Sequence, residues 1–101
     1  MKIFRQGDVL LRQVKELPKT AKRKGDKVLA YGEATGHKHQ FTSEFAELYV
    51  DVGGKQYAFL IERAVLEHEE HANIEVPEGT YEVVIQREFD PMQNWVRPVL
   101  D

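Results

Sequence analysis

Short apolar runs recur along this chain at intervals of about eight to twelve residues, with turn signals between them, and this limits its fold more than any other feature. The turn signals are Leu17-Pro18, Gly53-Gly54, Pro77-Glu78-Gly79 and Asp90-Pro91. A glycine pair between two apolar runs is a strong signal for a two-residue β-hairpin, and proline interrupts both helices and strand ladders. Because no segment keeps a 3.6-residue apolar period, the sequence predicts short strands and an all-β fold.

The apolar runs between the turns predict about seven to eight short, mainly antiparallel strands. We expect them over residues 8–15, 28–33, 35–42, 45–52, 57–61, 64–69, 81–87 and 95–100. In the clearest run, Tyr81, Val83 and Ile85 occupy alternate positions and so share one face. With 101 residues and 42% hydrophobic content, the chain suits one modest core. Residues 1–101 are therefore predicted to form a single small sandwich or barrel domain.

The composition excludes several classes of protein. The chain has no cysteine, which removes disulfides, iron–sulfur clusters and thiol nucleophiles and leaves nitrogen and oxygen to hold any metal. No apolar run approaches the roughly eighteen residues that a membrane span requires. Residues 1–5 lack the apolar region of a signal peptide, so we expect a cytoplasmic protein without membrane association.

Charge is unevenly distributed along the chain. Residues 1–40 carry ten Lys and Arg against four Asp and Glu, whereas residues 41–101 carry four against thirteen. Complementary patches of this kind predict a homodimer, with an unevenly charged but solvated surface as the alternative. The basic segment 19–27 could bind a phosphate, but it has no aromatic residue on which a base could stack, which argues against nucleic acid as a partner.

All four histidines lie in two short segments, Gly36-His37-Lys38-His39 and His68-Glu69-Glu70-His71. On a strand, residues i and i+2 face the same side, so His37 and His39 project together. In one helical turn or a bent strand end, residues i and i+3 are neighbours, which suits His68 and His71. Imidazole is the commonest metal ligand and the usual proton shuttle near neutral pH. We therefore predict that the fold brings the four side chains to one site.

The first hypothesis is a metal centre made by His37, His39, His68 and His71. Four imidazoles, or three with a carboxylate, suit a divalent transition metal such as Zn, Ni, Cu, Fe or Mn. The carboxylates nearest in sequence, any of which could bind the ion or orient an imidazole, are Glu44, Glu67, Glu69 and Glu70. Such a centre would serve a metal-dependent hydrolase or an enzyme of oxygen chemistry acting on a small molecule.

Two resemblances bear on this hypothesis. His37, His39 and then Glu44 after four intervening residues resemble the first metal-binding motif of the cupins, and Pro77-x-Gly79 resembles the turn that opens their second motif. The resemblance implies a small β-barrel that binds Fe, Mn, Ni or Zn through His37, His39 and Glu44. Where the cupin pattern has a further histidine, three residues after Gly79, this chain has Glu82. The chain also resembles small bacterial and phage proteins of unassigned function that share segments like QGDVLL, GHxH, HEEH and QREF.

Other hypotheses need no metal or no catalysis. One neutral and one protonated imidazole in a pocket can act as general base and general acid on a phosphodiester, as in a nucleotide hydrolase. Arg87, Lys38 or the basic segment would then stabilise the developing negative charge. Alternatively, the protein is a metal carrier, or an adaptor that binds a partner through its acidic segment 67–70. The sequence leaves open whether the protein is an enzyme.

Overall fold

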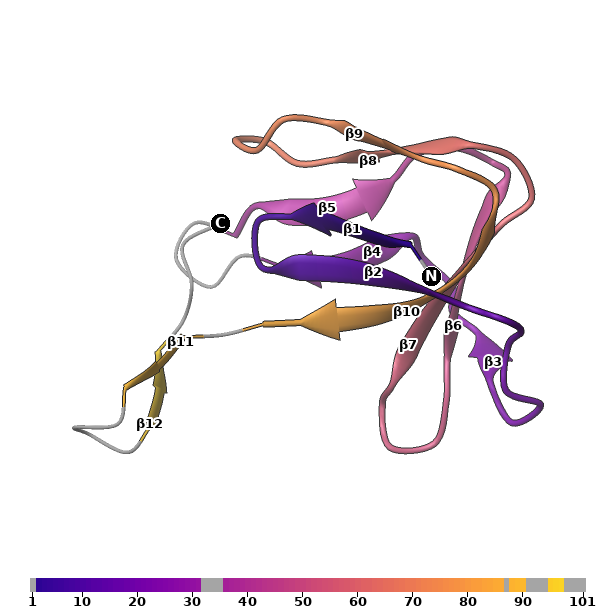
Figure 1. The fold of residues 1–101 in the computed structure, drawn as a ribbon, viewed down its shortest axis with the longest axis horizontal. Coiled ribbons are helices and arrows are strands. Elements are labelled where there is room, and N and C mark those ends of the chain that lie inside the picture. The colour runs from indigo at the N-terminus through magenta and orange to yellow at the C-terminus, as the bar shows by residue number, and fades with distance from the viewer. Residues whose placement is uncertain (1, 32–35, 87, 91–94, 98–101) are drawn as a thin grey trace.

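The computed structural model describes residues 2–31, 36–86, 88–90 and 95–97, and every helix or strand in that part of the chain is a β-strand (Figure 1). Ten of the strands form two antiparallel sheets, of six and four strands, with one hydrophobic core drawn from both. The prediction of a small all-β fold is therefore confirmed, in the form of a sandwich. Within the same residues, no helix is long and apolar enough to cross a membrane.

The larger sheet has its strands in the spatial order β1-β2-β10-β7-β6-β3. In chain order they are β1 (Ile3–Gln6), β2 (Val9–Val14), β3 (Lys22–Arg23), β6 (Ala46–Val50), β7 (Gln56–Leu60) and β10 (Gly79–Ile85). The longest strand, β10, lies between β2 and β7, with Val84 opposite Leu10. Because β10 is antiparallel to β2, its C-terminal end lies beside the β1–β2 turn, where the Gln86 N–H donates to the Asp8 carbonyl at 2.8 Å.

The smaller sheet has the order β4-β5-β8-β9. Its strands are β4 (Val28–Tyr31), β5 (Lys38–Phe41), β8 (Ala64–Glu67) and β9 (Ile74–Val76). Strands β5 and β8 pair with Gln40 opposite Glu67 and Phe41 opposite Leu66. Two further strands, β11 (Glu88–Asp90) and β12 (Trp95–Arg97), pair with each other in a separate ribbon.

The core lies between the sheets and takes alternate residues from several strands, among them β2, β5, β6 and β8. The side chains that fill it include Leu11, Leu48 and Tyr81 from the larger sheet and Phe41 and Leu66 from the smaller, each at most 1% exposed. Burial of a side chain of this size contributes about 1.5–3 kcal/mol. The same alternation on β5 turns His39 inward with Phe41, two residues later. Core packing therefore positions one histidine ring directly.

The hairpin predicted at Gly53-Gly54 is confirmed, but its connection covers residues 51–55 and not two residues. Both glycines have φ of +86°, a conformation that other residues seldom adopt, and β6 pairs with β7 on either side of them. The Asp51 N–H donates to the Lys55 carbonyl at 2.7 Å and closes the turn.

The strands are shorter and more numerous than the seven to eight predicted. Strand β3 has two residues and lies inside the expected basic loop, where Lys22 pairs with Val50 on the edge of the sheet. Strand β1 has four residues, with the hydrophobic side chain of Ile3 exposed. Neither segment has the alternation of apolar residues that predicts a strand. Both are strands only because they pair with a neighbouring strand, which the sequence pattern does not reveal. Residues 32, 33, 35, 87 and 98–100 of the predicted strands lie outside the described part of the chain.

Candidate metal centre

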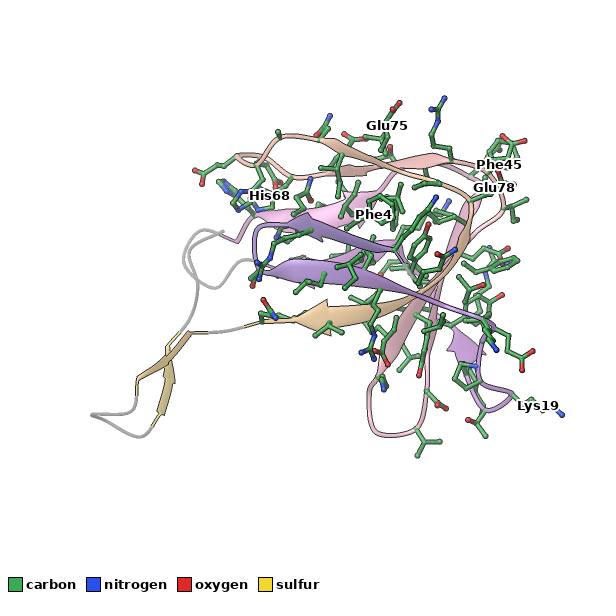
Figure 2. The ribbon with its side chains drawn as sticks, in the orientation of Figure 1. Phe4, Lys19, Phe45, His68, Glu75 and Glu78 are labelled. Carbon is green, nitrogen blue, oxygen red and sulfur yellow. The ribbon has the colours of Figure 1, made fainter. Side chains whose placement is uncertain are left out.

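Three segments meet at one end of the sandwich: the β1–β2 turn, the residues that lead into β5, and the connection from β8 to β9. The last two carry the histidines. Continuing the β5–β8 register beyond Gln40 and Glu67 places His39 beside His68. Figure 2 shows His68 at this end of the molecule, near the start of β5.

The four imidazole rings form one cluster with His68 in contact with the other three. The ring centroid of His68 lies 4.3 Å from that of His39, 4.6 Å from that of His71 and 5.7 Å from that of His37. The rings of His39 and His71 are 5.8 Å apart and inclined by 18°. Imidazoles bound to one ion at about 2 Å have centroids roughly 4.5–6 Å apart. The structure thus brings the four rings together, and their roles as ligands or catalysts stay predictions.

The cluster is largely shielded from solvent. His39 is 1% exposed and His68 8% exposed, and each of the four rings has at least one buried nitrogen, Nδ1 in His37 and Nε2 in the others. A buried ring nitrogen costs free energy unless a hydrogen-bonding group or an ion pairs with it. For Nε2 of His39 and of His71, the described residues supply no hydrogen bond.

Gln6 fixes the tautomer of His39. Its amide nitrogen donates to the carbonyls of Leu66 at 2.9 Å and Ala72 at 3.0 Å, so its Oε1 remains as the acceptor that faces His39 Nδ1 at 2.8 Å. This network assigns the ring proton to Nδ1 and leaves a lone pair on Nε2. Gln6 is 3% exposed and lay outside the residues indicated by the sequence pattern.

The carboxylate of Asp8 faces that lone pair. His39 Nε2 and Asp8 Oδ1 are 3.3 Å apart without the geometry of a hydrogen bond, and the Asp8 side chain is 10% exposed. Burial lowers the pKa of His39, and the neighbouring His68 lowers it further, although the charge of Asp8 opposes the shift. Sequence reasoning missed Asp8 because it lies in a turn, far from both histidine segments along the chain.

His71 packs against the β1–β2 turn at Gly7. The φ of Gly7 is +59°, and a Cβ atom there would lie 2.6 Å from His71 Nε2. The turn therefore requires glycine both for its backbone conformation and for the space that the imidazole occupies.

His68 also organises the bend that follows it. Its Nδ1 accepts hydrogen bonds from the backbone N–H groups of Glu70 at 3.0 Å and His71 at 3.1 Å. The predicted neighbourhood of His68 and His71 therefore comes from a capped bend after β8, not from a helical turn.

Two glutamates lie on the outer side of the cluster. Glu70 Oε1 is 3.8 Å from His37 Nδ1, and Glu69 Oε1 accepts the Lys38 N–H at 2.9 Å, which lowers the pKa of Glu69. One potential ligand atom from each of His37, His68 and Glu69 lies within 4.8 Å of the other two. Atoms bound to one ion lie about 3 Å apart, so this outer set would have to contract around a metal.

One other predicted site residue, Glu44, is not brought to the cluster. Glu44 is exposed and follows the far end of β5 from His37. Figure 2 places its neighbour Phe45 at the opposite end of the molecule from His68. Arg87 lies outside the described residues.

Glu82, which stands where the cupin pattern has a histidine, has different partners. It lies on β10 with its side chain 5% exposed, forms an ion pair with Arg12 and has a second with Lys55 at 2.5 Å. The hydrogen bond from Lys55 is the main cause that lowers the pKa of Glu82, against the opposing effect of burial. Glu82 thus belongs to a charged cluster on the larger sheet.

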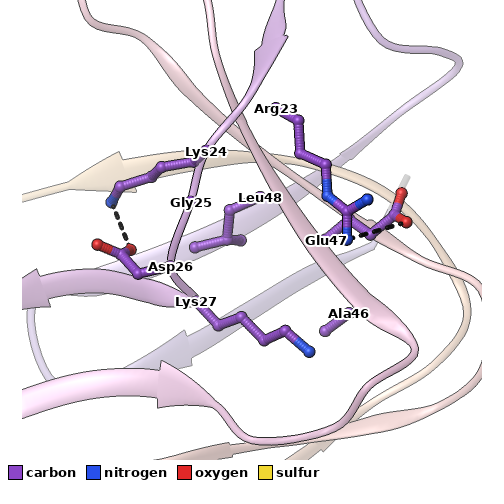
Figure 3. Close-up of a pocket in the computed structure, with 8 residues that line it drawn as sticks. All are labelled: Arg23, Lys24, Gly25, Asp26, Lys27, Ala46, Glu47 and Leu48. Atoms are coloured by element: carbon purple, nitrogen blue, oxygen red, sulfur yellow. Dashed lines mark ion pairs between the residues drawn. The ribbon is translucent and has the colours of Figure 1, made fainter.

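The basic segment borders a pocket of about 320 Å³ between β3 and β6 (Figure 3). Three of its cations already have partners within the chain. Lys24 Nζ donates to the Val28 carbonyl at 2.7 Å, Lys27 Nζ donates to the Ser43 carbonyl at 2.6 Å, and Arg23 lies 3.5 Å from Glu47. These contacts favour a structural role for the cations over the predicted phosphate site.

A smaller cavity of about 150 Å³ opens beside the histidines. Its lining consists of Lys38, Gln40, Glu67, His68 and Glu69. His68 is the residue that the cavity and the cluster share.

The fold and the site define a small antiparallel β-sandwich with a histidine cluster at one end. Residues 5–86 match the family described as Domain of unknown function (DUF8820), and the chain belongs to that family. The match includes the four histidines, Gln6 and Asp8, and agrees with the predicted membership of an uncharacterised family. No curated protein and no solved structure matches the chain.

Proposed function

We propose that this protein binds one divalent transition-metal ion at the end of the sandwich, between the β1–β2 turn and the histidine cluster. The observation that carries the proposal is the pair formed by His39 Nε2 and Asp8 Oδ1, which are 3.3 Å apart. With the proton of His39 on Nδ1, both atoms present lone pairs to each other. A cation between them turns this repulsion into attraction.

The spacing and the surroundings suit a metal ion. Two ligand atoms bound to one ion at about 2 Å lie roughly 3 Å apart, close to the observed separation. Metal-binding histidines commonly donate their second ring N–H to a fixed acceptor, and Gln6 Oε1 is such an acceptor for His39. His71 Nε2, buried against Gly7, adds a second imidazole nitrogen.

The ligands available are imidazoles and carboxylates. His39 and Asp8 supply one nitrogen and one oxygen 3.3 Å apart, and His71 supplies a second nitrogen from a ring whose centroid lies 5.8 Å from that of His39. His37 and Glu69 lie on the outer side of the cluster. A mixed set of this kind suits Zn, Ni, Fe or Mn, with softer ions disfavoured by the lack of sulfur.

The surroundings favour a small-molecule site over the other predicted functions. A phosphodiester or nucleotide would meet the carboxylates of Glu67 and Glu69, which line the cavity, and like charges repel. A carrier site needs ready exchange of the metal, whereas His39 is almost fully buried. The cavity beside His68 gives a small ligand access to the cluster, as a metal-dependent hydrolase or an enzyme of oxygen chemistry requires.

The test is a titration of protein purified without a histidine tag, using Zn²⁺, Ni²⁺, Mn²⁺ and Fe²⁺ with calorimetric and elemental detection. We expect one equivalent of at least one ion to bind. Asp8→Asn should weaken binding by about tenfold or more and His39→Ala by about a hundredfold or more. Glu44→Gln is the matched carboxylate control and should leave binding unchanged. Less than a stoichiometric amount of every ion, even in excess, would refute the proposal.

A further inference from the structure

His68 and His39 present chemically different nitrogens to the cluster. Backbone N–H groups can only donate, so the two bonds from Glu70 and His71 require a lone pair on His68 Nδ1. The neutral ring then carries its proton on Nε2. In His39 the acceptor Gln6 Oε1 places the proton on Nδ1, with the lone pair on Nε2. The two rings, 4.3 Å apart, therefore offer the site one N–H donor and one lone pair.

A metal bond to His68 Nε2 would disturb the bend after β8. The ring proton would have to move to Nδ1, where it would displace the N–H groups of Glu70 and His71 from their acceptor. That bend carries His71 to its place against Gly7, so the change would loosen a second candidate ligand. His39 requires no such rearrangement.

We propose that His68 is not a metal ligand, and that its Nε2–H donates a hydrogen bond to a small oxygen ligand, water or a small oxyanion, on the metal. This inference rests on the proposed function and names the class of ligand that the metal would bind besides the protein. His68 also lines a cavity of about 150 Å³ beside the cluster. That volume is about five times the volume of one water molecule in the liquid, which suits a ligand of a few heavy atoms.

The assignment gives the metal an exchangeable position. A site closed by four protein ligands is typical of structural metals, whereas three protein ligands and an exogenous oxygen are typical of catalytic ones. With a metal bound, the Nε2–H of His68 would hold a small oxyanion without changing the charge of the site.

Asparagine and glutamine separate the two nitrogens of His68. Asparagine keeps an acceptor near the position of Nδ1 and can still cap the bend, but it has no group at the position of Nε2. Glutamine reaches the position of Nε2 with an amide N–H. The test measures Co²⁺ affinity by calorimetry, and acetate affinity of the Co²⁺-loaded protein by visible absorption, for wild type, His68→Asn, His68→Gln and His71→Asn.

We expect His68→Asn to bind Co²⁺ within about threefold of wild type and acetate about tenfold more weakly, the loss of one hydrogen bond to a charged group. His68→Gln should recover part of the acetate affinity, and His71→Asn should lose most of the Co²⁺ affinity. If His68→Asn loses Co²⁺ as severely as His71→Asn, His68 is a ligand and the inference is wrong, although the metal site stands. Unchanged acetate affinity in His68→Asn would also overturn it. If wild type binds no metal, the proposed function fails instead.

A second measurement does not depend on folding of the variants. Long-range ¹H–¹⁵N correlation spectra of Zn²⁺-loaded wild type distinguish the two ring tautomers of each histidine. We expect the Nε2–H pattern for His68 and the Nδ1–H pattern for His39. An Nδ1–H pattern for His68 would contradict the inference.

Discussion

Gln6 controls the chemistry of His39 from another strand of the chain. Its three hydrogen bonds join β1 to β8, to the residue Ala72 and to the His39 ring; the bonds to β8 and to His39 are buried, and the bond to Ala72 is partly buried. A buried glutamine with this many partners is valuable because no apolar side chain can replace any of them. The residue therefore acts on the site by positioning a ligand, without contact to the metal.

We predict that Gln6→Leu destabilises the protein and weakens the metal site together. The substitution leaves two carbonyl groups and His39 Nδ1–H unpaired, which should cost about 2–4 kcal/mol of unfolding free energy. Metal affinity should fall about 10–100-fold, since the His39 ring loses its anchor. Gln86→Leu removes an exposed glutamine and should change stability by less than about 0.5 kcal/mol. Urea denaturation and calorimetric titration provide the two readouts; an unaltered metal affinity in Gln6→Leu would contradict the positioning role.

Gly7 allows a test of whether space at the turn matters for the metal. Gly7→Ala should lose about 1 kcal/mol of stability because φ is positive, and it should also displace His71, whose Nε2 lies 2.6 Å from the added Cβ. Gly54→Ala is matched in backbone strain, with φ of +86° and no atom within 4 Å of the added Cβ. Gly25→Ala has neither strain nor contact and should be nearly silent. We expect a larger stability loss for Gly7→Ala than for Gly54→Ala, because the displaced imidazole adds to the strain, and weaker metal binding for Gly7→Ala alone. Equal metal binding would show that the His71–Gly7 contact is irrelevant to the metal.

The histidine cluster was predictable from the sequence, but the residues that contact and orient its rings, Gln6 and Asp8, were not. His37 and His39 are two residues apart on a strand and so face the same side, and His68 and His71 are three residues apart and so are neighbours in a bend. Each pair lies at the end of a predicted strand. Asp8 and Gln6 carry no such spacing, and they reach the cluster only because β1 and β2 fold back over the smaller sheet. Glu44 was predicted as a ligand because it is close to His39 along the chain. The extended strand β5 separates the two residues in space, so this prediction was wrong about the position of Glu44.

At the scale of strands, β10 shows the predicted alternation of apolar residues, but one of its charged residues is buried although the alternation places it away from the core. Tyr81 and Val83 face the core, as the alternation indicated, but Glu82 on the other face is only 4% exposed. Its register opposite Arg12 on β2 and Tyr57 on β7 lets neighbouring side chains cover it. A single-strand pattern gives the face of a residue, whereas its burial depends on which residues stand opposite it in adjacent strands.

We predict that Glu82 makes the free energy of unfolding depend on pH in the acidic range. Since the folded-state pKa of Glu82 is lowered, its stabilising effect is fully present above the ordinary glutamate pKa of about 4.3 and is lost as pH falls through the lower folded value. Glu82→Gln should cost about 1–2 kcal/mol at neutral pH, with Arg12 and Lys55 half-exposed and therefore still hydrated. Below pH 4 the difference between variant and wild type should shrink. Denaturation at pH 7 and at pH 3.5 measures this, and a constant difference would exclude the charge of Glu82 as its cause.

At the scale of the whole molecule, the candidate ligands come from both layers of the sandwich. Asp8 follows β1 in the larger sheet, whereas His39 and His71 belong to β5 and the β8–β9 connection of the smaller sheet. A metal held by all three would therefore join the sheets at one end, where Gln6 already connects them by hydrogen bonds. The predictions of a cytoplasmic protein, a homodimer and a single domain concern this scale too, and they stay predictions.

Metal should consequently stabilise the entire sandwich and not just its own loops. An ion that binds only the folded state at a hundred times its Kd adds about 2.7 kcal/mol of stability, which corresponds to a rise in Tm of roughly 10–20 °C for a chain of this size. Far-UV circular dichroism follows the whole β-structure, so the shift should appear there as one cooperative transition. Asp8→Asn and His39→Ala should abolish most of the shift, because each removes a ligand from a different sheet, and Glu44→Gln should retain it. An equal metal-induced shift in His39→Ala would mean that the ion binds elsewhere. A shift limited to a local probe would mean that the site does not connect the two sheets.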